Sequence, residues 1–147
     1  MGQGGAAGPG DDVGRMVSLA DLECEAVRLW GSLPHGAVVW LSGELGAGKT
    51  ALVRAVARAA GAEPARSPTF ALVHEYASPT GVIAHVDCYR LRTPEEALDM
   101  DLFALAARAR LTLIEWPERA GPLAPPPQVH VKMSHGAVPE LRELELV

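Results

Sequence analysis

The hydrophobic and polar positions of this 147-residue chain repeat with two different periods, which predict alternating helices and strands. Apolar residues recur at helical spacing from about Leu19 to Ser32 and again from Thr50 to Ala60. Between these stretches, Ala37 to Leu41 is a short apolar run, as expected of a parallel strand that is buried on both faces. This part of the chain is therefore expected to fold as a helix, a buried strand and a second helix.

The remaining pattern predicts further strands and two short helices. The segments 70–76 and 82–87 flank the turn sequence Ser-Pro-Thr-Gly and are expected to form an antiparallel hairpin. Short helices are expected over 94–100 and 102–110, followed by a buried strand over 111–115. After an extended linker with four prolines over 121–127, alternation over 128–133 and 143–146 predicts a terminal hairpin or adjacent strands.

Length and composition limit the class of protein. A chain of this length is expected to form one domain, and 48% hydrophobic residues suffice for a core. The net charge of −5 argues against a broad basic surface for nucleic acid, so any RNA is expected to be handled through a partner. Two cysteines are too few for a disulfide framework and suit a reducing cytoplasm.

The ends of the pattern set the expected domain boundary. Residues 1–14 contain six glycines and no apolar segment that could act as a signal peptide, so residues 1–16 are expected to be a flexible tail. Residues 17–147 are expected to form the folded domain. No apolar run approaches the roughly 18 residues of a membrane span, so no contact with a membrane is expected.

The sequence Gly43-Glu44-Leu45-Gly46-Ala47-Gly48-Lys49-Thr50 matches the phosphate-binding pattern G-x-x-x-x-G-K-[ST], called Walker A. Its glycines allow backbone N–H groups to turn toward phosphate oxygens, and the following helix adds its positive end. Lys49 would reach the β- and γ-phosphates, and the Thr50 hydroxyl would bind Mg²⁺. The alternative is a tight glycine-rich turn without a ligand. The residues expected to contact the nucleotide here are Glu44, Leu45, Gly46, Ala47, Gly48, Lys49 and Thr50.

The order of strand, glycine loop and helix predicts an α/β fold: a single P-loop NTPase-like domain with a mixed parallel and antiparallel sheet flanked by helices.

Two predicted strands end in an acid, Asp87 and Glu115. Ligands of parallel α/β sheets bind at the carboxyl ends of the strands, so both acids would lie near the phosphates if their strands run parallel to the P-loop strand. Asp87 is expected to be the principal metal-side carboxylate, because Mg²⁺ prefers oxygen ligands. Glu115 would be a second metal-side group or would orient the attacking water. Each could also be an ordinary strand-end charge.

Other residues near these strands have two readings each. His85 shares a strand face with Asp87 and would support that carboxylate or cap the sheet edge. Thr69 would meet Mg²⁺ or the γ-phosphate, or would only follow a Ser-Pro turn. Trp116 would stack on the base or ribose, or would belong to the core. A zinc site at His74, His85 and Cys88 is not expected, because the residues lack a standard ligand spacing.

Four blocks together resemble the bacterial TsaE (YjeE) family of P-loop ATPases. The blocks are Gly43–Thr50, Ser67–Tyr76, His85–Leu91 and Ile114–Arg119. The first block is generic to P-loop proteins, whereas the other three in this order are specific, and the resemblance extends over about residues 18–133. Cys88 departs from the family, which usually has a larger aliphatic residue there.

The resemblance implies a subunit that binds ATP and Mg²⁺ and is needed for N6-threonylcarbamoyladenosine in tRNA, at adenosine 37. It implies that the chain acts in the cytoplasm with the partners TsaB and TsaD and meets tRNA only through them. Matched by position, the family's phosphate and metal residues correspond to Lys49 and Thr50, its sensing-loop threonine to Thr69, its metal-side aspartate to Asp87, and its glutamate–tryptophan pair to Glu115 and Trp116. Asp87 and Glu115 are thus the expected catalytic residues.

These features predict a nucleotide switch, in which ATP and Mg²⁺ order the segment around Thr69 and hydrolysis releases it. No arginine finger is evident, although Arg54, Arg66, Arg90 and Arg119 are candidates. Turnover in isolation is therefore expected on the order of 10⁻⁴ to 10⁻² per second, with stimulation by TsaB and TsaD. Two alternatives remain: a small-molecule P-loop kinase, and a nucleotide-dependent interaction module with negligible hydrolysis. A GTPase is disfavoured because no Asn-Lys-x-Asp guanine motif occurs.

Overall fold

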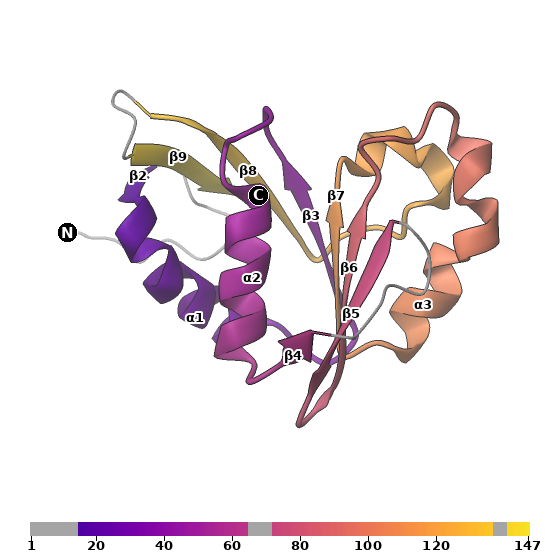
Figure 1. The fold of residues 1–147 in the computed structure, drawn as a ribbon, viewed down its shortest axis with the longest axis horizontal. Coiled ribbons are helices and arrows are strands. Elements are labelled where there is room, and N and C mark those ends of the chain that lie inside the picture. Colours follow the sequence, from indigo (N-terminus) through magenta and orange to yellow (C-terminus); the bar gives the residue numbers. More distant parts are fainter. Residues whose placement is uncertain (1–14, 65–71, 137–140) are drawn as a thin grey trace.

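The computed structural model describes residues 15–64, 72–136 and 141–147, and these form one twisted sheet with helices on both faces (Figure 1). Within the described residues the sheet has eight strands in the order β2-β9-β8-β3-β7-β6-β5-β4. The strands are β2 (Arg15–Ser18), β3 (Ala37–Ser42), β4 (Glu63–Pro64), β5 (Val73–Ser78), β6 (Gly81–Asp87), β7 (Leu111–Glu115), β8 (Val129–His135) and β9 (Leu141–Leu146).

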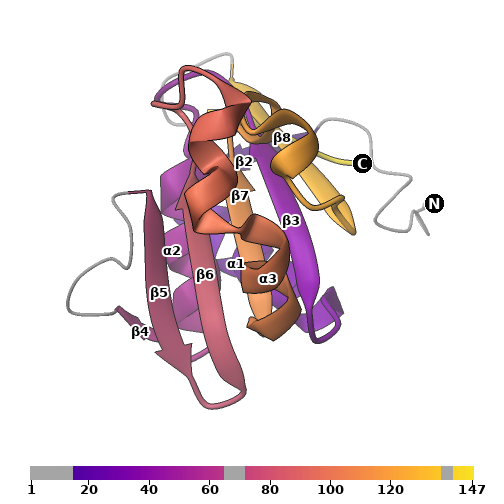
Figure 2. The ribbon, with the colours of Figure 1, turned by 90° about the vertical axis from the view of Figure 1, so that its right-hand side faces the viewer.

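The helices divide between the two faces of the sheet. Helices α1 (Leu22–Ser32) and α2 (Lys49–Ala59) pack against each other on one face. Helix α3 (Leu102–Arg108) covers the other face, as Figure 2 shows from the side of α3. The connections also contain short 3₁₀ helices: η2 (Leu19–Asp21), η3 (Pro94–Met100), η4 (Pro117–Arg119) and η5 (Gly121–Leu123).

The centre of the sheet is parallel and its flanks are antiparallel, so the predicted mixed α/β fold is confirmed. Strand β3 pairs in parallel with β7 and β8, and β6 pairs in parallel with β7. The predicted hairpin of β5 and β6 and the terminal hairpin of β8 and β9 are both antiparallel. The carboxyl ends of β3, β6 and β7 therefore lie at the same end of the sheet. This is the arrangement that brings both strand-end acids to the P-loop.

Alternation along the strands separates two hydrophobic clusters. Ile83, Leu111 and Leu113 face α1 and α2, whereas Val86 and Ile114 face α3. Residues two positions further along the same strands keep the same face. The side chains of Asp87 and Glu115, the last residues of β6 and β7, therefore lie on the face of the sheet that α2 covers.

Several local expectations need correction. Strand β2 was not predicted and begins at Arg15, two residues inside the expected tail, because it pairs with β9. The first α-helix begins at Leu22 rather than Leu19, after a 3₁₀ turn in which the Ser18 hydroxyl accepts a hydrogen bond from the Asp21 N–H at 3.1 Å. The expected helix over 94–100 is 3₁₀, and the proline-rich linker contains η5.

Candidate functional site

The glycine loop lies between β3 and α2, and its backbone adopts conformations that suit glycine. Gly43, Gly46 and Gly48 have φ angles of 149°, 80° and 104°. The left-handed region is sterically costly for other residues, so the glycines are needed for this loop shape. Helix α2 begins at Lys49, directly after Gly48, so its N-terminal N–H groups face the loop.

Lys49 is buried beneath this loop although it carries an ammonium group, with only 4% of the residue exposed. Its Nζ donates hydrogen bonds to the carbonyl oxygens of Gly43 and Glu44, the latter at 2.9 Å. Nζ also lies 4.8 Å from the ring centroid of Trp116. Burial lowers the pKa of Lys49, and the negative charges of Glu115 and Asp87 oppose that shift.

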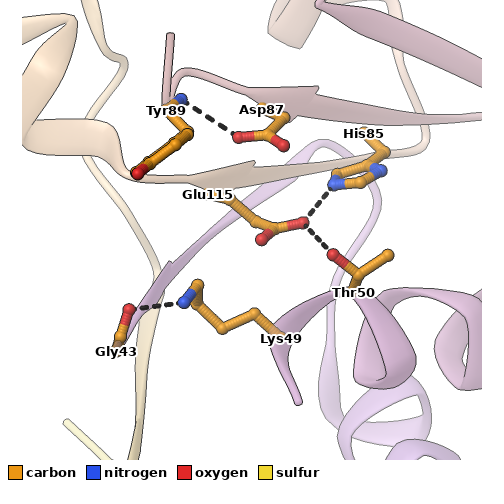
Figure 3. A network of polar contacts seen from close by, with 7 residues as sticks. All are labelled: Gly43, Lys49, Thr50, His85, Asp87, Tyr89 and Glu115. Atoms are coloured by element: carbon orange, nitrogen blue, oxygen red, sulfur yellow. Dashed lines mark hydrogen bonds and ion pairs between the residues drawn. The ribbon is translucent and has the colours of Figure 1, made fainter. Parts of the chain in front are cut away.

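Glu115 is the centre of a buried hydrogen-bond network, which Figure 3 shows. Its Oε2 accepts a hydrogen bond from the Thr50 hydroxyl at 3.0 Å and lies 2.6 Å from His85 Nε2. Burial favours the protonated acid, but the hydrogen bond and charge of His85, the Thr50 hydroxyl and the Lys49 ammonium outweigh it and lower the pKa of Glu115. The glutamate is thus held as a carboxylate in contact with the first turn of α2.

Asp87 ends strand β6 opposite Glu115 in the parallel register. Its Oδ1 accepts a hydrogen bond from the backbone N–H of Tyr89 at 3.0 Å, which orients the carboxylate at the turn after the strand. Asp87 is half-buried, whereas Glu115 is only 3% exposed. The two carboxylates therefore differ in access to solvent, and only Glu115 hydrogen-bonds the Thr50 hydroxyl.

Trp116 stands at the rim of the site in a left-handed backbone conformation, with φ 56° and ψ 50°. Such a conformation is uncommon for a bulky residue and occurs often at functional sites. The indole ring lies 5.1 Å from the ring of Tyr89, centroid to centroid, and Arg119 Cζ lies 5.4 Å from it. Trp116 packs against the cluster that contains Val86 and Ile114 and also borders the cleft, while its stacking on a base or ribose stays a prediction.

These side chains line one cleft of about 250 Å³ at the carboxyl edge of the sheet. Of the residues expected to form the nucleotide site, the cleft is lined by Leu45, Gly46, Gly48, Lys49, Thr50, Asp87, Glu115 and Trp116. Glu44 and Ala47 belong to the same loop but do not line it, and the Ala47 side chain is buried in the core. Thr69 lies outside the described residues, as does Arg66.

Ala51 and Tyr89, which line the cleft, were missed from the sequence, and the partner of His85 was misassigned. Tyr89 lines the cleft, and its place two residues after Asp87, inside the block His85–Leu91, was the available signal. His85 contacts Glu115 on the neighbouring strand, whereas it was expected to support Asp87 or cap the sheet edge. Among the described arginine candidates, Arg119 lies near the site, with Cζ 5.1 Å from the ring of Tyr89, but neither it, Arg54 nor Arg90 lines the cleft.

The cleft supplies oxygen atoms of the kind that a bound cation needs. In the described part of the chain, no group of three or more His, Cys, Asp or Glu side chains could enclose a metal ion. The cleft does bring together the Thr50 hydroxyl and the two carboxylates of Asp87 and Glu115. Mg²⁺ is commonly bound by one or two carboxylates together with substrate phosphates, so these oxygen donors fit Mg²⁺ shared with a phosphate ligand.

The fold and this site define a P-loop α/β protein. A family model described as "Threonylcarbamoyl adenosine biosynthesis protein TsaE" matches residues 17–143. The chain belongs to the TsaE family, as its sequence motifs suggested.

Individual relatives agree with this family. The chain is 35% identical over 128 residues to the tRNA threonylcarbamoyladenosine biosynthesis protein TsaE of a Nostoc species, covering 82% of this chain and 78% of that protein. It is 35% identical over 111 residues to the protein of the same name from Haemophilus influenzae, covering 75% and 69%. The fold is also similar to the crystal structure of Bacillus subtilis YdiB, with a TM-score of 0.68 at 20% identity over 92% of this chain and 86% of that one.

No helix in the described ranges combines the length and the apolar character that a membrane crossing requires.

Proposed function

We propose that this protein is a Mg²⁺-dependent ATPase subunit that serves threonylcarbamoyladenosine formation in tRNA, and that it acts as a nucleotide switch on TsaB and TsaD. Membership in the TsaE family supports the pathway. The observation that carries the ATPase proposal is the single cleft in which Lys49 and Thr50 of the glycine loop face Asp87 and Glu115.

The loop and the start of α2 would bind the phosphates. Backbone N–H groups at a helix N-terminus attract anions, and the left-handed glycines turn the loop backbone around the same point. Lys49 would exchange its hydrogen bonds with the Gly43 and Glu44 carbonyls for phosphate oxygens. Burial destabilises the charged form of Lys49 and lowers its pKa. The negative charge of a phosphate ligand would oppose that shift. Trp116 and Tyr89 would border the nucleotide at the rim.

The chain's own oxygens would organise the metal. The Thr50 hydroxyl proton is donated to Glu115, which leaves the lone pairs of Oγ1 for a cation. Asp87 would contribute a second oxygen from the far side of the cleft. Bound Mg²⁺ would neutralise charge on the phosphate oxygens during transfer to water. The contact between Thr50 and Glu115 supports Glu115 as a second metal-side carboxylate beside Asp87.

We further propose that hydrolysis is slow without partners. No described arginine candidate lines the cleft, so the positive charge that stabilises the transition state in fast P-loop enzymes would come from TsaB or TsaD. A switch requires the partners to bind the ATP and ADP states with different affinities. The tRNA chemistry itself would take place on the partner proteins.

The decisive experiment is reconstituted tRNA modification over multiple turnovers with TsaB, TsaD and either wild-type protein or Lys49→Ala. Removal of the ammonium should weaken ATP binding by about 10- to 150-fold, measured by calorimetry, and should stop repeated turnover. In parallel, Asp87→Asn and Glu115→Gln should reduce hydrolysis more than ATP affinity, because they disturb metal organisation rather than phosphate binding.

Surface lysine Lys132, exposed in strand β8, provides the matched control. Lys132→Ala removes the only other lysine and should leave ATP affinity and modification unchanged. Modification that proceeds equally with Lys49→Ala would refute the proposal. Hydrolysis that requires a small-molecule acceptor would indicate a kinase, and ATP binding without hydrolysis in the full complex would indicate an interaction module.

A further inference from the structure

His85 is a buried polar side chain close to the nucleotide site that belongs neither to the phosphate loop nor to the metal-side oxygens. Only 5% of the residue is exposed, although it lies two positions before the end of β6 and close to the cleft. Its Nε2 lies 2.6 Å from Glu115 Oε2, the same oxygen that accepts the Thr50 hydroxyl proton. The three residues come from β6, β7 and α2, so the network joins three elements of the fold at one atom.

The hydrogen-bond chemistry of this junction fixes the direction of both bonds. A carboxylate oxygen only accepts hydrogen bonds, so the Thr50 hydroxyl and the His85 ring must both donate to Oε2. The ring must therefore carry a proton on Nε2. Figure 3 shows the other carboxylate oxygen of Glu115 turned away from His85 and Thr50. One oxygen is thus occupied by two donors, and the side chain cannot rotate without breaking both bonds.

We propose that His85 is a positioning residue for the nucleotide site: its Nε2–H bond holds the Glu115 carboxylate, and through it the Thr50 hydroxyl, in the orientation that a magnesium–nucleotide complex requires. This inference rests on the proposed function. Neighbours that orient metal-binding side chains commonly change activity or metal affinity by about 10- to 100-fold when removed. His85 makes no direct contact with the ligand in this scheme and acts through Glu115.

Substitutions at His85 separate this role from simple packing. His85→Phe keeps a ring of similar size but has no donor, and it should lower kcat for hydrolysis of ATP with Mg²⁺ in the TsaB–TsaD complex by about 10- to 100-fold. ATP affinity measured without Mg²⁺ should not change, because the phosphate loop is untouched. His85→Gln supplies an amide N–H and should recover most of the loss.

A matched control is available in the neighbouring strand. His74 is exposed, pairs with His85 in the β5–β6 register, and its ring centroid lies 5.9 Å from that of His85. His74→Ala should leave kcat and Mg²⁺ dependence at the wild-type level. Wild-type kcat in His85→Phe, or an equal loss in His74→Ala, would overturn the inference.

A spectroscopic measurement tests the same bond without catalysis. In protein labelled with ¹⁵N-histidine, His85 should show a protonated Nε2 with a slowly exchanging proton, and Glu115→Ala should abolish that protection. A ring protonated only at Nδ1, or protection that survives Glu115→Ala, would overturn the inference. If wild-type protein fails to hydrolyse ATP with its partners, the proposed function fails, whereas this signal and the Mg²⁺ dependence of ATP affinity still decide the role of His85.

Discussion

Gly43 and Met133 approach so closely that no side chain fits between them. A Cβ added at Gly43 would lie 2.1 Å from the backbone carbonyl oxygen of Met133 in strand β8. Real Cβ atoms do not come this close to backbone, so either the glycine loop or β8 would have to move. The first glycine of the loop is thus required by the packing of the sheet as well as by any phosphate ligand.

Gly43→Ala should therefore destabilise the protein and disturb the site together. The added clash and the φ of 149° predict a loss of about 2–4 kcal/mol in the free energy of unfolding, measured by urea denaturation. Gly36→Ala is the matched control, because Gly36 also has a positive φ, 87°, but an added Cβ would meet no atom within 4 Å. It should cost only about 1–2 kcal/mol. Equal losses in the two variants would show that backbone conformation, rather than contact with Met133, sets the requirement.

Thr112 has a buried polar atom that lacks a hydrogen-bond partner among the described residues. The residue is fully buried in β7, and in the described part of the chain its Oγ1 makes no hydrogen bond. Thr112→Val replaces the hydroxyl by a methyl group of similar size and should raise the free energy of unfolding by about 1–2 kcal/mol. Thr80→Val, at an exposed turn, should change stability by less than about 0.5 kcal/mol. A loss of stability in Thr112→Val would show that the hydroxyl is satisfied in solution.

The position of Trp116 predicts an optical signal for ligand binding. Its ring lies 4.8 Å from the Lys49 ammonium and borders the cleft, so movement of Lys49 toward a phosphate would change the indole environment. In a Trp30→Phe, Trp40→Phe background, ATP with Mg²⁺ should alter the remaining fluorescence. Adding Lys49→Ala should greatly reduce the change at the same ATP concentration. Fluorescence that stays constant at saturating ATP would assign Trp116 to packing alone.

The two cysteines should react very differently. Cys24 is exposed on α1, whereas Cys88 is fully buried, and burial together with the negative charges of Asp87 and Glu118 raises the pKa of Cys88 to about 12. The thiolate is the reactive form, so Cys88 is protected both by access and by protonation. Iodoacetamide at pH 8 should add one label to the native protein and two after denaturation, as counted by mass spectrometry. Two labels in native protein would show that the turn after β6 opens readily.

The central strands could be predicted from the sequence because burial on both faces leaves a local signal. Ala37 to Leu41 is an apolar run and Leu111 to Glu115 is apolar at three of its five positions, and both are strands close to the expected bounds. The edge strands β2 and β4 leave no such signal, since they have four and two residues and owe their structure to pairing with β9 and β5. Their existence depends on long-range partners that no local pattern reveals.

The site shows the same division between local and long-range information. Lys49, Thr50, Asp87 and Glu115 were predicted because the loop motif and the strand-end acids are local features, and the parallel order of the strands brings them together. The partner of His85 was not predicted. Two-residue spacing along β6 suggested Asp87, which lies on the same face of the strand, whereas the contact is made to Glu115 on the neighbouring strand. The face of a strand can be read from its own residues, but which neighbour a side chain meets depends on register.

Strand β8 carries a histidine that should make stability depend on pH. His130 Nε2 lies 2.7 Å from the Ser42 hydroxyl, directly before the glycine loop, and its pKa is lowered by burial and by the charge of Lys132, with Glu118 opposing. A histidine whose pKa is lower in the folded state binds protons more readily when the protein is unfolded. Its contribution to the free energy of unfolding is therefore complete above its unfolded pKa of about 6.5 and is lost as the pH falls through the folded pKa. The free energy of unfolding should thus decrease from pH 7 toward pH 5 in wild-type protein, and His130→Gln should show a smaller decrease over the same range. His35→Gln, at an exposed position, should keep the wild-type dependence. Parallel pH profiles for wild type and His130→Gln would mean that proton uptake elsewhere controls acid stability.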